Sequence, residues 1–315
     1  MPKKFSELVA TTMTFVGPLT SPINPQAAFS ALAIDSTAES LRIPGTIYSM
    51  RYAVGDEQYI RGIPTEKKAF KNCISISMTT STKDISAKLS KDTIQLAGGK
   101  SMKHGEEACN LLLEALKDAE RERLYALDHP EENEAVVNWY EENIKEKSDG
   151  TLIYPRKAPR HLDAILLNRY LRLFYEYNDK TSLMEEMHWL AEKCPQIIDL
   201  DCELSTVTTA MVNYNFQLDH PLDRYKVSDA AEDTGLIEDF IVTLNNTAQP
   251  TIRFSLPIDP TELGETYKIG KKPQHTFIVY ASGKVMHSAP RISLMEAAYD
   301  KFCKMTIPFQ SVPQN

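Results

Sequence analysis

Long apolar runs are missing from this sequence. None approaches the ~18–20 residues that a membrane-spanning helix requires, and the N-terminus (Met-Pro-Lys-Lys-Phe-Ser-Glu) lacks the apolar stretch of a secretory signal. The five cysteines are scattered and contain no CxxC pair, which argues against a disulfide framework and a zinc ribbon and favours a reducing compartment. Glycine (12) and proline (18) are too few for a low-complexity chain. We therefore expect an intracellular globular protein of one large or two small domains.

Signatures of catalysis and metal binding are missing as well. The seven histidines show no HxxxH or HExxH spacing, and there is no GxSxG. Residues 99–101 (Gly-Lys-Ser) imitate the end of a phosphate-binding loop, but the first glycine of that motif would fall on Ile94. Carboxylate pairs such as Glu106-Glu107 lie on helical stretches, where a solvated face explains them. We expect no enzymatic activity, no cofactor and no metal site.

The net charge of −8 is unevenly distributed along the chain. Residues 1–100 hold 12 basic and 8 acidic side chains, residues 101–200 hold 13 and 21, and residues 201–315 hold 10 and 14. The middle third alone therefore carries a charge equal to that of the whole chain, and the two flanks together are neutral. The overall acidity argues against a nucleic-acid partner only for the middle of the chain.

The first hundred residues resemble a series of strands, because β-branched residues and period-two alternation recur between turn residues. The expected strands are residues 8–15, 46–54, 70–78, 85–89 and 93–97. A short helix is expected at 24–32, and a tight turn at Lys91-Asp92 joins the last two strands. From Ser101 onward, helical apolar spacing predicts an amphipathic helix with Ser101 as its N-cap.

The last third repeats this order of elements. Its expected strands are residues 207–212, 240–244, 251–256, 277–280 and 284–288. A helix follows, opened by the capping-box match Ser293-Leu-Met-Glu296. Between the two similar parts, residues 161–177 and 182–191 predict helices in an acidic segment. We therefore divide the chain into a first αβ unit (1–127), an acidic helical insert (128–200) and a second αβ unit (201–315).

The ends of the two αβ units match element by element. Residues 88–101 and 279–292 each run strand, tight turn, strand, small residues, basic residue and helix. Lys100 and Arg291 take the same place in this order. A repeat of this size indicates a pseudo-twofold pair of units whose strands join in one curved sheet with helices on its back.

These repeats resemble the TATA-box-binding protein family, most of all the divergent forms encoded by large nucleocytoplasmic DNA viruses. The residues that carry the resemblance are 70–77 (Phe-Lys-Asn-Cys-Ile-Ser-Ile-Ser), 85–89 with 93–101, and 275–285 (His-Thr-Phe-Ile-Val-Tyr-Ala-Ser-Gly-Lys-Val). The resemblance covers about 5–101 with the following helix, and 204–306. It implies an α+β fold, namely a duplicated saddle whose curved antiparallel sheet has helices on its convex face, with the all-helical insert between the repeats.

The resemblance also implies that the concave face of the sheet lies on the DNA minor groove. That groove offers only acceptors on A·T pairs, so short apolar and polar side chains fit against its floor. The residues implied at the floor are Val9, Thr11, Gln95, Ala97, Val207, Thr209, Met286 and Ser288. The cations implied at the flanking phosphates, which would give a salt-dependent affinity, are Lys88, Lys100, Lys284 and Arg291.

The remaining implied contacts depart from the pattern of the family. Its wedge residues, which open base steps, correspond to Phe70, to Leu89 or Ser90, and to Tyr280, and the fourth wedge has no counterpart. Glu7 and Ser205 stand where the family has asparagines that contact base edges. A carboxylate would repel adenine N3 or thymine O2 but accept a hydrogen bond from guanine N2, so TATA specificity does not follow.

Each of these residues also has a purely structural interpretation. The β-branched residues would face a helix, and Phe70 would be a core aromatic. Lys100 and Arg291 would be surface cations at helix starts, although a cation at a helix N-terminus opposes the helix dipole and so favours an anionic partner.

The function implied by the resemblance is a non-enzymatic, sequence-specific transcription initiation factor. It would bind and bend double-stranded promoter DNA and recruit a TFIIB-like factor and RNA polymerase, in a nucleus or a cytoplasmic viral factory and away from membranes. The acidic insert would be a protein-docking surface. One alternative is an interaction scaffold that has lost DNA binding, which Glu7 and Ser205 favour. Another is a nucleic-acid-processing enzyme, which would need a carboxylate cluster on the sheet.

Overall fold

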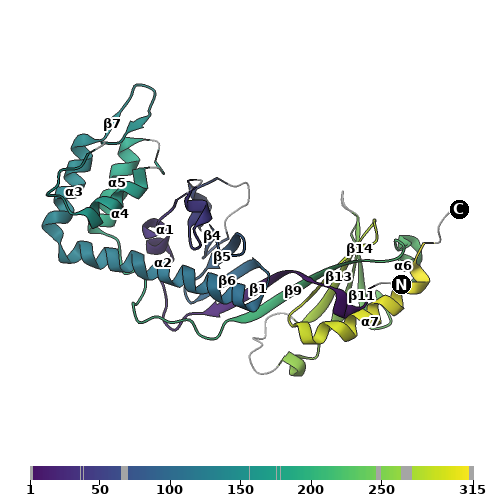
Figure 1. Ribbon diagram of the computed structural model, residues 1–315. Helices are drawn as coiled ribbons and strands as arrows, with labels where there is room; N and C mark the ends of the chain where they lie inside the picture. Colours follow the sequence, from purple (N-terminus) through teal and green to yellow (C-terminus); the bar gives the residue numbers. More distant parts are fainter. Residues whose placement is uncertain are drawn as a thin grey trace. The chain divides into compact units, whose positions relative to one another are not determined.

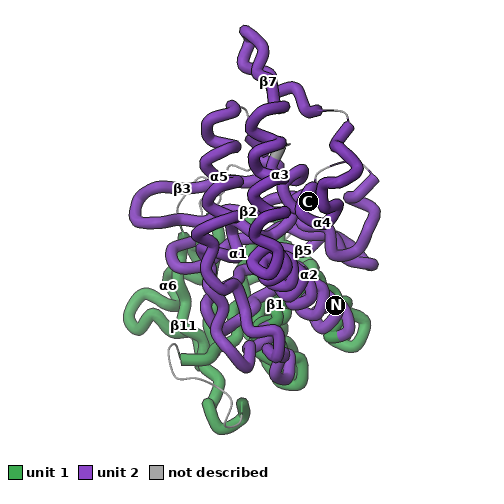
Figure 2. The backbone as a smooth tube through the Cα atoms, turned by 90° about the vertical axis from the view of Figure 1, so that its left-hand side faces the viewer, with its two compact units in different colours: residues 1–15, 99–102, 208–315 green, residues 16–98, 103–207 purple. Residues whose placement is uncertain are grey.

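The structure is a computed structural model that describes residues 3–35, 37, 39–64, 70–155, 157–174, 176–177, 179–245, 250–263 and 272–311. These residues form an α+β chain with antiparallel strands and seven α-helices (Figure 1). The chain divides into two compact units (Figure 2). Unit 1 comprises residues 1–15, 99–102 and 208–315, and unit 2 comprises residues 16–98 and 103–207. The three-part division at residues 127 and 200 stays a prediction.

Apart from the separate pair β7-β8, five strands of unit 2 are paired in the order β6-β5-β4-β2-β3. Their bounds are β2 Ile47–Val54, β3 Glu57–Gly62, β4 Ile74–Met78, β5 Ile85–Leu89 and β6 Thr93–Gly99. Strand β1 (Ala10–Pro18) contributes its first six residues to unit 1 and the rest to unit 2. The sequence did not predict β3, whose first four residues are all exposed and show no alternation of burial.

The core of the strands in unit 2 is aliphatic. The alternate strand residues that are buried there are Met50, Ile74, Ile76, Met78, Ile85, Ala87, Leu89, Ile94 and Leu96. Helix α2 (Met102–Asp128) lies close to this part of the unit, because a Cβ at Gly17 would stand 3.0 Å from the Cys109 Sγ. Glycine at position 17 therefore permits the helix to approach the strand. With 27 residues, α2 is about 40 Å long and continues well past the strands.

The second half of α2 belongs to a helical cluster. Its other elements are α3 Pro130–Asn143, β7 Lys145–Glu146, β8 Leu152–Ile153, α4 Ala164–Phe174 and α5 Lys180–Glu192. Ala126 from α2, Val136 and Tyr140 from α3, and Leu166 and Leu183 are buried together in its core. The helices predicted at 161–177 and 182–191 are confirmed as α4 and α5, with shifted ends. Helix α1 (Pro25–Ala31) begins after Asn24, whose side chain accepts from the Ala27 amide.

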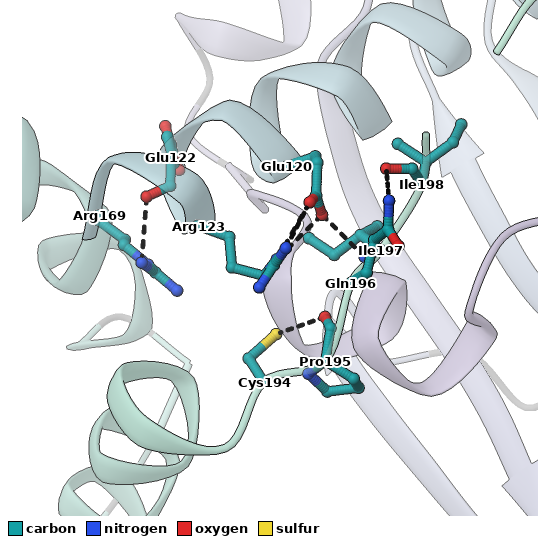
Figure 3. A network of polar contacts seen from close by, with 9 residues as sticks. All are labelled: Glu120, Glu122, Arg123, Arg169, Cys194, Pro195, Gln196, Ile197 and Ile198. Carbon is teal, nitrogen blue, oxygen red and sulfur yellow. Dashed lines mark hydrogen bonds and ion pairs between the residues drawn. The ribbon is translucent and has the colours of Figure 1, made fainter. Parts of the chain in front are cut away.

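Hydrogen bonds made by buried charged side chains join α2 to other parts of unit 2 (Figure 3). Glu120 is 1% exposed and accepts hydrogen bonds from Arg123 Nη2 (2.6 Å) and from the backbone N of Ile197 (2.8 Å). Arg169, on α4, donates to the carbonyl oxygens of Glu122 (3.2 Å) and Leu190 (3.0 Å). Helix α2 is thereby tied to α4, to α5 and to the segment that precedes residue 200.

Unit 1 contains six strands in the order β10-β11-β12-β13-β14-β9. Their bounds are β9 Thr208–Gln217, β10 Leu236–Ile237, β11 Phe240–Asn245, β12 Thr251–Pro257, β13 Gln274–Tyr280 and β14 Lys284–Ala289. Its helices are α6 Arg224–Ala231 and α7 Met295–Thr306. The predicted capping box is wrong, because Ser293 lies inside a 3₁₀ turn (η4, Ile292–Leu294) and α7 starts without a side-chain cap.

Further 3₁₀ turns complete the chain. They are η1 Phe5–Glu7, η2 Ser40–Arg42, η3 Pro260–Leu263 and η5 Ile307–Phe309. The first of these turns is anchored in unit 1, where the ring centroid of Phe5 lies 5.0 Å from that of Tyr214 and 5.6 Å from that of Tyr299.

The core of unit 1 is aromatic. Phe302 of α7 stacks on Phe277 with a centroid distance of 4.1 Å, and the ring centroid of Phe254 lies 5.5 Å from that of Phe302. His287 is fully buried, and its ring stacks on that of Phe277 with a centroid distance of 3.9 Å. The Nε2 atom of His287 lies 3.1 Å from the Nδ1 atom of His275. Burial lowers the pKa of His275 to about 4, and burial together with the neighbouring His275 lowers the pKa of His287 to about 3. Both imidazoles are therefore neutral core residues at pH 7.

Candidate functional site

The strands of unit 1 have one face in the core and an opposite face that we call the open face of unit 1. Alternate residues such as Phe216, Phe277 and Val285 pack with Phe302 and Tyr299 of α7. Because side chains alternate along a strand, the intervening residues lie on the other face. Following the register of β9, β14, β13, β12 and β11, these are Asn213, Asn215, Gln217, Lys284, Met286, Ser288, Thr276, Ile278, Tyr280, Thr251, Arg253, Ser255, Ile241, Thr243 and Asn245. All except Ser255 are partly or fully exposed.

The same alternation defines the open face of unit 2. Its residues on β2, β4, β5 and β6 are Ser49, Arg51, Ser75, Ser77, Ser86, Lys88, Gln95 and Ala97. The β5 and β6 members are exposed or half-buried, whereas Ser49, Ser75 and Arg51 are at most 7% exposed. Phe70, which precedes β4, is 51% exposed, and the Lys88 Nζ lies 3.3 Å from the centroid of its ring.

The two open faces are built on one pairing scheme. In unit 2, Ser75 pairs with Lys88 and Lys88 with Gln95. In unit 1, the corresponding cross-strand row is Arg253, Ile278 and Met286. The neighbouring rows are Ser77, Ser86 and Ala97 in unit 2 and Ser255, Thr276 and Ser288 in unit 1. Small hydroxyl-bearing or methyl side chains therefore lie next to a row that contains a cation in each unit.

Carboxylates are nearly absent from these strands. Outside the short pair β7-β8, the strands of the two described units contain the basic residues Arg51, Arg61, Lys88, Arg253 and Lys284, and their only acidic residue is Glu57, on the edge strand β3. The whole chain nevertheless holds 43 acidic residues against 35 basic ones. The acidic side chains are therefore concentrated outside the sheet, and the open faces are positively charged and polar.

The structure places many of the predicted site residues on these two faces. They are Lys88, Gln95, Ala97, Tyr280, Lys284, Met286 and Ser288, with Phe70 beside Lys88. Lys100 and Arg291 are exposed where a strand gives way to a helical turn, and Lys100 Nζ donates to the Thr11 carbonyl oxygen (3.1 Å). That any of these residues contacts DNA stays a prediction.

Leu89 and Glu7 do not lie on an open face. Leu89 is completely buried, because it pairs with Ile74 and Ile94 in the row that faces the core, so it is not available as a wedge. Glu7 is an exposed residue of the turn η1, which precedes the strands and whose Phe5 packs on Tyr299 of the unit 1 core. That Glu7 contacts base edges stays a prediction.

The predicted register is wrong in β1, where Thr11 lies on the same face as the buried Met13 and Phe15, whereas for β9 the outward placement of Thr209 stays a prediction. Val9 is 79% exposed but precedes β1, and Thr11 donates through Oγ1 to the Asn213 carbonyl oxygen (3.0 Å). Ser205 and Val207 precede β9. Thr209 Oγ1 lies 3.0 Å from the Met102 Sδ, at the start of α2, so its hydroxyl is engaged there.

Other residues of β1 and β9 take the expected places on the open face of unit 1. Asn213 Nδ2 donates to Thr12 Oγ1 (2.9 Å), which puts Thr12 on the same face as Asn213. Phe15 is fully buried, so the residues that alternate with it, Thr12 and Thr14, face the other way. Aromatic residues in the sequence indicate this register, because Phe15 and Phe216 mark the core-facing positions of their strands.

The groups on the open faces are suited to the recognition of a polar or anionic partner. The faces present hydroxyl, amide, methyl and cationic groups, which bind acceptors and phosphates. In the described part of the chain, no group of three or more His, Cys, Asp or Glu side chains could hold a metal ion. No helix among the described residues is long and apolar enough to span a membrane.

Comparisons with known proteins give little further information. No family model matches the chain, and no curated protein sequence matches it. Among solved structures, the chain is similar to a TBP from Methanococcus jannaschii, with 8% sequence identity and a TM-score of 0.38 over 96% of this chain and 99% of that chain. A TM-score this low does not establish a shared fold, so function has to be inferred from the geometry of the two open faces.

Proposed function

We propose that the chain is a non-enzymatic DNA-binding protein, a transcription initiation factor of the TATA-box-binding type, that contacts DNA through the open faces of its two units. The observation that carries this proposal is the segregation of charge. In a chain with a net charge of −8, the strands outside the short pair β7-β8 contain one carboxylate, Glu57, while Lys88, Arg253 and Lys284 occupy the open faces. Such a surface attracts a polyanion and spares it the repulsion that scattered carboxylates would cause.

The side chains between the cations suit the minor groove. Ser86, Ala97, Thr276 and Ser288 are short, and Asn213 and Asn215 carry amide donors for the acceptors at the groove floor. Phe70 is half exposed and adjacent to Lys88, so it is available to enter a base step while the ammonium group turns to a phosphate. Tyr280 is the candidate for the same role in unit 1.

The proposal includes a duplicated saddle with a helical insert. The same strand order and register in the two units support the duplication. Helices α3, α4 and α5 are the insert, and we assign them the docking of protein partners such as a TFIIB-like factor or RNA polymerase. Five exposed carboxylates of α3 would keep this surface away from DNA, namely Glu131, Glu132, Glu134, Glu141 and Glu142.

The test is the binding of a fluorescently labelled pool of randomised duplexes, measured by polarisation over a series of KCl concentrations, with sequencing of the retained DNA. The wild-type chain should bind with a clear salt slope and enrich particular sequences. The double variant Arg253→Gln/Lys284→Gln should lower the slope by about two, because each lost phosphate contact removes about one released counterion. Lys304→Gln, which removes one positive charge at an exposed position of α7, is the control for each of the two single substitutions and should leave the slope unchanged.

A second candidate function is a protein-interaction scaffold that keeps the fold without binding DNA. One observation favours it: Ser49, Ser75 and Arg51, which lie at the β2-β4 end of the open face of unit 2, are nearly buried and so are not available to DNA. A folded wild-type chain that shows no salt slope and no enriched sequence would select the scaffold and reject the DNA-binding proposal.

A further inference from the structure

Unit 2 contains a pocket of about 460 Å³ bordered by α1, the β2-β3 hairpin and α5. Aromatic rings from four separate segments line it: Phe29, Tyr52, Tyr59, Tyr177 and Trp189. The rings of Phe29 and Tyr52 lie 5.7 Å apart, centroid to centroid. The volume lies within the range of about 300–1,000 Å³ that is typical of ligand sites.

A buried ion pair forms one wall of the pocket. Arg61 Nε donates to Glu176 Oε2 (2.6 Å) and Arg61 Nη2 to Glu176 Oε1 (2.8 Å). Arg61 Nη1 donates to the carbonyl oxygens of Phe29 and Ser30. The side chains of Arg61 and Glu176 are 8% and 4% exposed. Because all three guanidinium nitrogens already donate and the pair is neutral, this wall offers an incoming ligand neither a free cation nor a free anion.

Glu186 gives the pocket a net negative charge. It lines the pocket from α5, and no ion pair to it is formed by the described residues. Its carboxylate, after burial, contributes to raising the pKa of the Tyr177 hydroxyl far above its usual range. Five aromatic rings, whose faces are electron-rich, therefore surround a site with one uncompensated carboxylate. Such a site attracts an organic cation through cation–π and ionic contacts.

We propose that this pocket binds the positively charged side chain of an arginine or lysine presented by a partner protein. The rim argues for a polypeptide as the source of the cation, because Val54, Tyr59 and Ile60 line the pocket and are 52%, 46% and 45% exposed. Exposed apolar side chains around a charged pocket suit a partner that covers them on binding. The inference does not depend on DNA binding, since none of these residues belongs to the cation-bearing rows of Lys88 and Arg253.

The test uses ¹⁹F NMR of the full chain labelled with 5-fluorotryptophan. The chain has two tryptophans, and Trp139 on α3 does not line the pocket, so it is an internal control for Trp189. The probe is N-acetyl-arginine methylamide, and its neutral counterpart is N-acetyl-citrulline methylamide. We expect the arginine probe to shift the Trp189 resonance in a saturable way and to leave that of Trp139 in place. The citrulline probe should bind at least about fivefold more weakly, as the loss of a cation–π contact implies.

Two neighbouring glutamates on α5 give matched variants. Glu186→Gln removes the carboxylate of the pocket and should weaken the arginine probe by roughly three- to tenfold. Glu185→Gln makes the same change at an exposed position that does not line the pocket and should leave binding unchanged. Far-UV circular dichroism of both variants establishes that they are folded.

Three results would overturn the proposal. They are a Trp189 resonance that does not respond to the arginine probe, equal binding of the arginine and citrulline probes, and unchanged binding by Glu186→Gln. Tetramethylammonium distinguishes the source of the cation. Tighter binding of tetramethylammonium than of the arginine probe would assign the pocket to a free quaternary ammonium compound and reject the partner side chain.

Discussion

The two units share a pairing scheme but fill it with different side chains. By register, Phe277 of unit 1 corresponds to Ala87 of unit 2, and His287 corresponds to Leu96. Unit 1 thus has a core of stacked rings, whereas the strands of unit 2 bury aliphatic chains. The comparison teaches that strand order and alternation define these sheets, while the packing of each core is an independent solution. The same holds for the open faces, where Lys88 corresponds to Ile278.

The largest effect is expected from the aromatic core. Phe302→Ala removes the ring that stacks on Phe277 and should cost about 3–5 kcal/mol of unfolding free energy. Urea unfolding followed by circular dichroism measures this loss. Both tryptophans lie in unit 2, so their fluorescence reports that unit alone. If the units unfold independently, Phe302→Ala shifts the circular dichroism transition and spares the fluorescence transition.

The matched variant for unit 2 is Leu112→Ala, at a fully buried position of α2. It should cost about 2–5 kcal/mol and should shift the tryptophan transition. A Phe302→Ala protein with an unchanged circular dichroism midpoint would contradict the assignment of this ring to the core of unit 1.

The second effect is a pH dependence that arises from the two adjacent buried histidines of unit 1. The folded-state pKa values of His275 and His287 are lowered to about 4 and about 3 by burial. Between the unfolded value of about 6.5 and these values, the unfolded chain binds protons that the folded chain does not. Stability from these two groups is complete above pH 6.5 and falls as the pH is lowered, by up to about 1.4 kcal/mol per pH unit for each histidine.

His287→Leu places in unit 1 the residue type that unit 2 has at position 96. The variant should lose part of the decrease in unfolding free energy between pH 6.5 and 4, measured by urea titrations at several pH values. His220→Gln, at an exposed position, is the control. A variant whose stability follows the pH as steeply as that of the wild type would show that His287 is not the titrating group.

The β5-β6 hairpin and the helices α4 and α5 could be predicted from the sequence, whereas the β2-β3 hairpin and the register of the first strand could not. The β5-β6 hairpin was clear because Ile85, Ala87 and Leu89 alternate with polar residues up to the turn. In residues 8–15, threonine and valine suit either face of a strand, so alternation alone left two registers. Phe15 resolves the choice only through its close approach to Gly99, where a Cβ would lie 2.1 Å from a ring carbon. That contact joins residues far apart in the chain.

The aromatic pocket was beyond sequence reasoning for a similar reason. Its rings come from residues 29, 52, 59, 177 and 189, and none of these positions forms a local motif. The open faces were partly predictable, because Lys88, Gln95 and Ala97 follow from the period of their hairpin. Arg253 lies between the buried Ile252 and Phe254, so alternation places it on the open face, but it was missed. The repeat gave no hint of a cation there, because the corresponding residue of unit 2 is Ser75.

The third effect concerns Phe70, an exposed aromatic for which unit 1 has only the partly buried Tyr280. Phe70→Ala should change the unfolding free energy by no more than about 1 kcal/mol, because the ring is half exposed and loses only its contact with Lys88. It should reduce DNA bending, measured by energy transfer between dyes at the ends of a bound duplex. Tyr280→Ala tests the aromatic residue on the open face of unit 1, which corresponds by register to Ser90. Undiminished bending by a folded Phe70→Ala protein would remove Phe70 as a wedge.

The smallest effect comes from exchanging the residues of the shared cross-strand row. Lys88→Ile should lower the salt slope of DNA binding by about one, and Ile278→Lys should raise it by about one, because each change removes or adds a single phosphate contact. The double variant should restore the wild-type slope, since the total number of contacts is unchanged. Polarisation titrations over several KCl concentrations measure all three slopes. If Lys88→Ile lowers the slope but Ile278→Lys leaves it unchanged, the row of unit 1 does not face the phosphates. The two open faces would then share their strand pairing but not their mode of contact with DNA.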